Sequence, residues 1–201
     1  MKKNTEIRKS KNLTRNHLLF TAYREIYKNG SAGASLNDIL QSANISKGAI
    51  YYYFDSKREL VLAIIREIIH RNFSKRWRRI LETEKEITKA IIKSLKTIKM
   101  DFKLGCPLNK LIQEADMNDA QISQALNETY FEWEDLFTNA LDRAKKNGEL
   151  NSNIRAKDLS AFIVSVIEGS LIRSKLTGNK NDFLLPINQL EKYLYSLKTL
   201  Q

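Results

Sequence analysis

The chain has 201 residues, 42% of them apolar, which is enough for one compact core or for a small module joined to a larger one. Its single cysteine excludes an intrachain disulfide, and its two histidines, His17 and His70, are too far apart in sequence to suggest a metal-ligand cluster. No nucleophile with its base, acid/base pair or phosphate-binding loop stands at a workable spacing, so we expect no catalysis, no metal and no cofactor.

The composition predicts helices. Only 7 glycines and 2 prolines occur, while good helix formers are abundant, so we expect an all-α chain of about nine helices. The N-terminal segment, residues 1–12, is basic and lacks the apolar run of a secretory signal, and no uncharged apolar run is long enough to span a bilayer. We therefore expect a cytoplasmic protein that does not enter the membrane.

Positive charge is concentrated in the first part of the chain. Residues 1–80 contain 17 Lys and Arg against 6 Asp and Glu, a net charge of +11, whereas residues 81–201 contain 17 of each kind. An ordinary solvated surface does not require such segregation. The first part is therefore expected to bind a polyanion, and the second part to serve another purpose.

Three helices are predicted at the N-terminal end. The first runs from Leu13 and ends at Gly30. The second begins after Ser35, whose side chain can cap it while Asp38 completes a capping box, and Ser46 can cap a short third helix. Two short helices around a brief turn are typical of a helix-turn-helix.

A fourth helix is predicted to begin after Ser56 and to continue through the strongly basic residues 71–79. We place the domain boundary inside this helix, near Ile68. Residues 1–67 would then form a three-helix bundle with the helix-turn-helix, and residues 68–201 a second, helical domain.

The remaining sequence is predicted to form helices that end at turn residues such as Gly148 and Gly178. The last two helices carry apolar residues on more than one face, which is typical of helices that pack against a partner chain. The five predicted ranges are residues 85–102, 107–115, 120–147, 156–177 and 184–200.

Residues 46–57 read Ser-Lys-Gly-Ala-Ile-Tyr-Tyr-Tyr-Phe-Asp-Ser-Lys and resemble the recognition-helix signature of the tetracycline-repressor (TetR) family. The resemblance covers about residues 14–62. One departure is Ala49, where the family often has a hydroxyl, so this contact is not carried over. The resemblance implies a repressor that binds a palindromic double-stranded DNA operator as a homodimer and is released by a small-molecule effector.

The chemistry of this segment suits DNA independently of the resemblance. Lys47 supplies charge for a phosphate, and Gly48 lets the helix backbone approach a duplex closely. Three successive tyrosines spread around a helix, so they cannot all be buried, although burial of Tyr51 in an aromatic cluster is as good an interpretation as DNA contact. Lys57 and Ser35 each start a helix and can meet a phosphate there. The predicted DNA-binding residues are Ser35, Ser46, Lys47, Gly48, Tyr51, Tyr52, Tyr53 and Lys57.

The resemblance also assigns roles to the second domain. It places the homodimer interface in the last two helices and a pocket for an unknown small-molecule effector among residues 85–147. Aromatic stripes at helical spacing are more often plain core than ligand site, so both interpretations stay open. The candidate pocket residues are Phe102, Leu111, Tyr130, Trp133 and Phe137, with Trp77 as a further candidate.

Cys106 stands between Gly105 and Pro107, where a helix begins, with Lys103 and Lys110 near in sequence. A helix N-terminus and nearby cations favour the thiolate, which predicts a redox or electrophile sensor whose modification releases DNA. The alternative is an inert, buried thiol, since most free cysteines are of that kind.

Two further functions are compatible with the basic segment. The chain could be a non-regulatory, helical DNA-binding protein, or residues 71–79 could lie on an anionic lipid surface. Saturable, sequence-selective binding to duplex DNA would separate a regulator from both.

Overall fold

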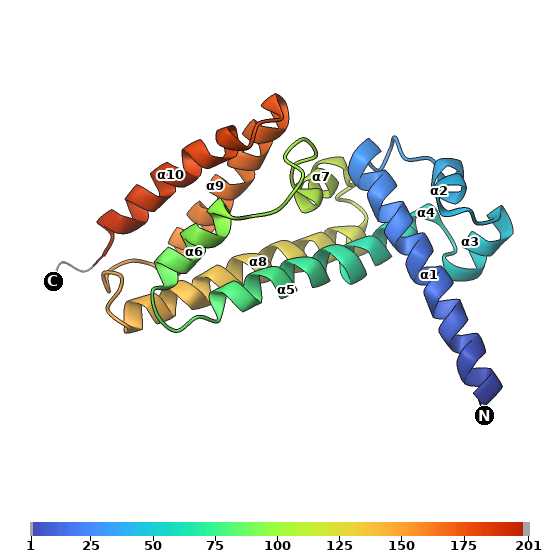
Figure 1. Ribbon diagram of the computed structural model, residues 1–201, viewed down its shortest axis with the longest axis horizontal. Coiled ribbons are helices and arrows are strands. Elements are labelled where there is room, and N and C mark those ends of the chain that lie inside the picture. Colours follow the sequence, from blue (N-terminus) through green and yellow to red (C-terminus); the bar gives the residue numbers. More distant parts are fainter. Residues whose placement is uncertain (1, 199–201) are drawn as a thin grey trace. The chain divides into compact units, whose positions relative to one another are not determined.

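The computed structural model describes the backbone of residues 2–198 and the side chains of residues 11–78 and 82–198. Within these ranges the chain forms helices and no strand, which confirms the all-α prediction. Because α4, η1 and α5 follow one another without a break, the described residues form nine helices (Figure 1). The bounds are α1 Lys2–Asn29, α2 Leu36–Ala43, α3 Lys47–Tyr53, α4 Lys57–Ala63, η1 Ile64–His70, α5 Arg71–Leu81, α6 Ile87–Lys96, α7 Pro107–Glu114, α8 Ala120–Lys146, α9 Ala156–Thr177 and α10 Lys180–Ser196.

The helices fall into two compact units. Unit 1 comprises residues 1–71 and 110–127, and unit 2 comprises residues 72–109 and 128–201. The first break in the chain lies close to the predicted boundary near residue 68. The assignment of residues 110–127 to the N-terminal unit was not foreseen from the sequence, which placed them in the second domain.

The core of unit 1 is built from α1, α2, α3 and the α4–η1 segment. One apolar side chain of each of α1, α2 and α4 that lies in this core, Leu18, Ile39 and Leu60, has no exposed surface. Helix α1 begins at Lys2 rather than at the predicted Leu13, since no helix-breaking residue interrupts the basic segment before it.

Serine residues precede three helices of unit 1, with different roles. Ser35 makes the predicted capping box with Asp38, and Ser56 accepts a hydrogen bond from the backbone of Glu59. Ser46 occupies the N-cap position of α3, but its side chain makes no capping hydrogen bond. The Ser46 hydroxyl is thus not used by the fold of the helix that it precedes.

Unit 2 contains α6, α9, α10 and most of α8. Figure 1 shows α9 and α10 side by side as an antiparallel pair, and α6 packs on α10, with Lys96 and Glu191 forming an ion pair 2.5 Å long. Helix α8 ends before Gly148 and α9 before Gly178, both with positive φ, as predicted.

Two helices of unit 2 differ from the predicted ranges. Helix α6 ends at Lys96 rather than near residue 102, because local turns around Asp101 replace the helix, with the backbone amides of Leu104 and Gly105 both donating to the Asp101 carbonyl. Helix α10 begins at Lys180 rather than at residue 184, because the side chain of Asn179 caps its first turn. No helix of the described residues is long and apolar enough to cross a bilayer.

Candidate nucleic-acid interface

The connection between α2 and α3 is a tight turn of three residues. Asn44 adopts the left-handed conformation, with φ of 52°, and its amide donates to the Gln41 carbonyl. The amide of Ile45 then donates to the Leu40 carbonyl at 3.1 Å, which closes the end of α2 and redirects the chain into α3. Asparagine tolerates this conformation better than most residues do. The geometry is that of a helix-turn-helix, as the sequence predicted.

Helix α3 is held by one face. Ile50 and Phe54, four residues apart, are each only 2% exposed, and the guanidinium of Arg15 lies over the Phe54 ring at 4.9 Å while it pairs with Glu67. Glu67 raises the pKa of Arg15, chiefly through its hydrogen bond. The recognition helix is therefore fixed in rotation about its own axis, and its opposite face is presented to solvent.

The exposed face of α3 carries the predicted contact residues. Lys47 and Gly48 are exposed, as are Tyr51 at 49% and Tyr52 at 62%. Tyr53 is half-buried, and its ring meets the edge of Tyr52 at 4.9 Å. Burial of Tyr51 in an aromatic cluster, the alternative left open by the sequence, does not occur.

Gly48 has no structural role inside the chain. A Cβ atom added at this position would meet nothing within 4 Å, and the backbone does not need a positive φ there. Glycine inside a helix costs about 0.5–1 kcal/mol relative to alanine. A helix that carries this cost for no internal reason is typical of a surface that must approach a partner closely.

Lys11 adds positive charge to this face, which was not foreseen residue by residue. It belongs to α1, yet its ammonium lies 5.0 Å from the centroid of the Tyr52 ring and donates a hydrogen bond to the Tyr52 hydroxyl. This hydrogen bond is the main cause that raises the pKa of Lys11. The basic N-terminal segment was the only signal in the sequence that pointed to it.

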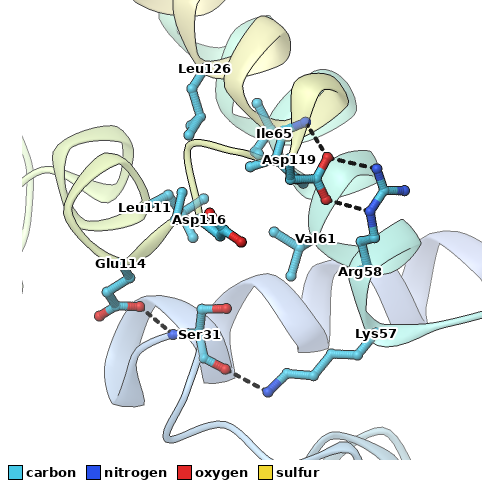
Figure 2. A pocket seen from close by; sticks show the side chains of 12 residues that line it. Ser31, Lys57, Arg58, Val61, Ile65, Leu111, Glu114, Asp116, Asp119 and Leu126 are labelled. Carbon is cyan, nitrogen blue, oxygen red and sulfur yellow. Dashed lines mark hydrogen bonds and ion pairs between the residues drawn. The ribbon is translucent and has the colours of Figure 1, made fainter.

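Two other predicted phosphate ligands are engaged inside unit 1. The Ser35 hydroxyl accepts from the Asp38 amide at 3.1 Å and donates to the Asp38 carboxylate. The Lys57 ammonium donates to the Ser31 carbonyl (Figure 2). An ammonium has three donors, so this bond leaves Lys57 able to meet a phosphate, whereas the capping box occupies the Ser35 hydroxyl.

The candidate effector residues do not all come together. Trp133, 2% exposed, lies within ring contact of Tyr130 and Phe137, at centroid distances of 6.2 and 6.3 Å. Phe102 instead packs on Phe183, and Leu111 belongs to unit 1. Trp77, the further candidate, joins these rings, and the structure adds Phe73. We call this group the aromatic cluster; its members are Phe73, Trp77, Tyr130, Trp133 and Phe137.

A buried carboxyl group accompanies the aromatic cluster. Glu168 of α9 is 8% exposed, and its Oε2 accepts from Asn109 at 2.7 Å. The pKa of Tyr130 is raised by burial first, and then by the charges of Glu134 and Glu168. Burial is the main cause that raises the pKa of Glu168 itself. Among the described residues, Glu168 Oε1 and the indole Nε1 of Trp133 are buried without a hydrogen-bond partner. A charged residue inside the apolar sequence of α9 was the signal that could have singled out Glu168.

Cys106 lies in a different environment from the one that the sequence suggested. It is 7% exposed, and burial, followed by the nearby Glu168, raises the pKa of its thiol well above the ordinary value. The expectation of a favoured thiolate is therefore wrong for this conformation. Lys110, one of the two cations invoked, belongs to unit 1 and donates to the carbonyls of Tyr27 and Lys28 at the end of α1.

Several side chains of the basic helix α5 contact other residues of unit 2. Trp77 is buried, Arg76 donates to the Lys99 carbonyl, and Arg78 pairs with Glu132 at 3.5 Å. The side chain of Arg79, part of the predicted basic stretch, lies outside the described ones. Since the apolar side of α5 faces the core, it is not available to lie on lipid. No group of three metal-ligating side chains occurs among the described residues.

Two family models match the chain. Residues 18–64 match the model of bacterial regulatory proteins, tetR family, and residues 73–184 match the model of the tetracyclin repressor-like C-terminal domain. The first match contains the helix-turn-helix and its buried face, and the second contains the aromatic cluster and the whole of α9 with Glu168.

Similar proteins agree with both models. An HTH-type transcriptional regulator in the lacX 3′ region of Lactococcus lactis subsp. lactis is 30% identical over 181 residues, which cover 84% of this chain and 86% of that protein. The HTH-type transcriptional regulator LmrA of Bacillus subtilis is 25% identical over 177 residues, which cover 85% of this chain and 91% of that protein. In fold, a TetR transcriptional regulator from Chloroflexus aurantiacus superimposes with a TM-score of 0.83 at 22% identity, covering 96% of this chain and 100% of that one.

Proposed function

The chain belongs to the tetR family of bacterial regulatory proteins, and on this basis we propose that it represses transcription by binding a palindromic DNA operator as a homodimer. The observation that carries the proposal is the exposed face of α3. It combines a cation, a glycine with open space around it and two exposed tyrosines on a helix whose other face is anchored in the core. Chromosomal DNA as partner implies that the protein acts in the cytoplasm.

In this proposal α3 enters the major groove. Lys47, and Lys11 beside Tyr52, meet phosphates, and the open surface of Gly48 lets the backbone come close to the duplex. Tyr51 and Tyr52 offer hydroxyls and ring edges to sugars, phosphates or thymine methyl groups. Lys57, at the start of α4, contacts a phosphate with the remaining donors of its ammonium.

The exposed apolar residues of α9 and α10 support the homodimer. Phe162 of α9 packs edge to face on Tyr193 of α10 at 5.3 Å, and both remain 46% exposed. Isolated exposed apolar side chains are ordinary, but a set on two adjacent helices indicates a surface that another chain covers. The other members of this set are Ile172, Leu176, Leu185 and Tyr195, between 53% and 86% exposed.

Release by a small-molecule effector is proposed for unit 2. The aromatic cluster offers an apolar and polarisable surface, and the unpartnered Nε1 of Trp133 and Oε1 of Glu168 offer one donor and one acceptor. An effector would lower operator affinity if it favoured a dimer in which the two α3 helices no longer fit half-sites about 34–36 Å apart.

The test is fluorescence anisotropy with labelled duplex DNA from upstream of the chain's own gene, in excess unlabelled competitor DNA. Binding should saturate at one dimer per site. Lys47→Ala and Tyr52→Phe should each weaken it, by about 1–3 kcal/mol where a specific contact is lost, without changing the dimer. Lys157→Ala, which removes an exposed cation from the first turn of α9, is the matched control. Equal affinity for operator and competitor DNA would favour the non-regulatory alternative.

A further inference from the structure

Unit 1 contains a cavity that the proposed function does not use. It has a volume of about 250 Å³ and lies between the first turns of α4 and the segment that joins α7 to α8 (Figure 2). All the residues that line it belong to unit 1, and it shares no residue with the aromatic cluster of unit 2. At about 30 Å³ for each small group, it has room for roughly eight non-hydrogen atoms.

One side of the cavity is apolar. Val61 and Ile65, one turn apart on α4 and η1, form this side together with Leu111 of α7 and Leu126 of α8. All four are at least nine-tenths buried, so a ligand that covers them removes little additional area from water but fills an existing space. The body of a ligand at this site would therefore be a compact hydrocarbon, such as one aromatic ring.

The other side of the cavity is charged, and only one of its two cations, Arg58, is paired with a carboxylate. Arg58 pairs with Asp119 through two nitrogens, with Nη2 at 2.6 Å from Oδ1, and Lys57 donates to the Ser31 carbonyl. Glu114 accepts from the backbone amide of Ser31. Three carboxylates thus face two cations, Lys57 and Arg58, and the lining carries one excess negative charge.

Among the described lining residues, Glu114 and Asp116 have no cationic partner. The Oδ1 of Asp116 accepts from the backbone amide of Asn118 at 2.9 Å and from the side-chain amide of the same residue at 3.0 Å. Among the residues that the structure describes, no cation pairs with Asp116. Asp116 is exposed, and Figure 2 shows its carboxylate beside Leu111, on the side that faces Val61.

We propose that this cavity binds a small organic monocation, with its hydrocarbon body on Val61 and Ile65 and its ammonium or amidinium group on Asp116. A cation neutralises the excess negative charge of the lining, whereas an anion would increase it. A neutral molecule would leave Asp116 without a charged partner. The walls include Lys57, which follows the recognition helix in the chain and is a proposed phosphate ligand. The occupant of the cavity therefore touches the DNA-binding apparatus directly.

The experiment uses the full-length protein without DNA, so that its result does not depend on the proposed repression. The probe is benzylamine, which has a ring and an ammonium group of the required size, and its neutral counterpart is benzyl alcohol. Binding is followed by NMR of labelled isoleucine, leucine and valine methyl groups at constant ionic strength. Benzylamine should shift the Val61 and Ile65 methyl signals with a dissociation constant on the order of 1 mM, as for a ligand of this size.

Two variants and one control separate charge from shape. Asp116→Asn keeps an acceptor for Asn118 and should weaken benzylamine about fivefold to tenfold while leaving benzyl alcohol unchanged. Ala115→Leu fills part of the cavity and should abolish the binding of both probes. Asp135→Asn, an equal charge change on the exposed surface of unit 2, should have no effect. The proposal is overturned if Asp116→Asn binds benzylamine as the parent protein does, if benzyl alcohol binds equally well, or if no methyl signal of the cavity moves at about 20 mM probe.

Discussion

Lys11 of α1 and Tyr52 of α3 are separated by 41 positions in the sequence, yet the lysine ammonium lies over the tyrosine ring and donates to its hydroxyl. The basic N-terminal segment is thereby connected to the exposed face of the recognition helix. In the proposed complex with DNA, Lys11 supplies a phosphate contact beside α3.

Lys11→Ala should therefore weaken operator binding and lower the slope of log affinity against log salt by about 1, since one fewer counterion is released. Anisotropy titrations at several salt concentrations measure both effects. Lys89→Ala, an exposed lysine of unit 2, should leave the slope unchanged. An unchanged slope for Lys11→Ala would place this residue outside the interface.

Gly48→Ala should affect folding and DNA binding in opposite directions. The free energy of unfolding should rise by about 0.5–1 kcal/mol, because alanine is the better helix former and its Cβ meets nothing in this chain. Operator affinity should fall, because the added methyl group separates α3 from the duplex. Urea denaturation and anisotropy measure the two quantities. A variant that gains stability and keeps full affinity would contradict the role given to Gly48.

Leu176→Glu should convert the dimer to a monomer. Leu176 is 86% exposed in the single chain, so the substitution should leave the monomer fold intact while a charge is placed in the proposed interface. Sedimentation velocity reports the change, and operator affinity should fall because a monomer fits only one half-site. Phe131→Glu, at an exposed residue of α8, is the control and should remain dimeric.

Cys106 should react slowly with iodoacetamide in the folded protein at pH 7. Burial raises the pKa of its thiol, and the thiolate is the reacting form. The same shift predicts that the contribution of this thiol to the free energy of unfolding is fully present below the ordinary thiol pKa of about 8.5. This contribution is lost as the pH rises above that value, because the thiol then ionises in the unfolded chain but not in the folded one. Mass spectrometry of the alkylated protein, compared with the chain in urea, measures the rate. Equal rates in the two states would revive the thiol-sensor hypothesis.

Glu168→Gln should stabilise the protein at pH 7, raising the melting temperature by about 2–4 °C for each kcal/mol gained. Burial raises the pKa of Glu168, so its protonated form is favoured in the fold, and stability falls as the pH rises above the ordinary value of about 4.3. Glutamine does not titrate, so the gain should grow from pH 4 towards pH 7. A gain independent of pH would show that desolvation of the carboxylate is not the cause.

Local patterns predicted much of the fold and of the DNA-binding face. Gly148 and Gly178 end their helices as expected, and the three tyrosines of α3 are not all buried, as the helical period required. These features depend on residues within one or two turns of each other, where spacing alone decides which face is buried.

What the sequence did not reveal depends on contacts between distant segments. The raised pKa of Cys106 results from its burial and from Glu168, 62 positions away, whereas its sequence neighbours suggested the opposite shift. Phe102 and Trp133 are both aromatic, but only Trp133 belongs to the aromatic cluster. Because α6 ends before Phe102 and the chain turns there, Phe102 packs on Phe183 instead. Helical period cannot predict such pairings.

The return of residues 110–127 to unit 1 has a consequence for recombination between relatives. The backbone passes between the units three times, after residues 71, 109 and 127, so the DNA-binding unit is not a single excisable segment. A chimera that exchanged only residues 1–71 would set a foreign α4 against the native Leu111 and Leu126. Functional exchange of operator specificity should therefore require that the two segments be transplanted together, or that only the outward side chains of α3 be replaced.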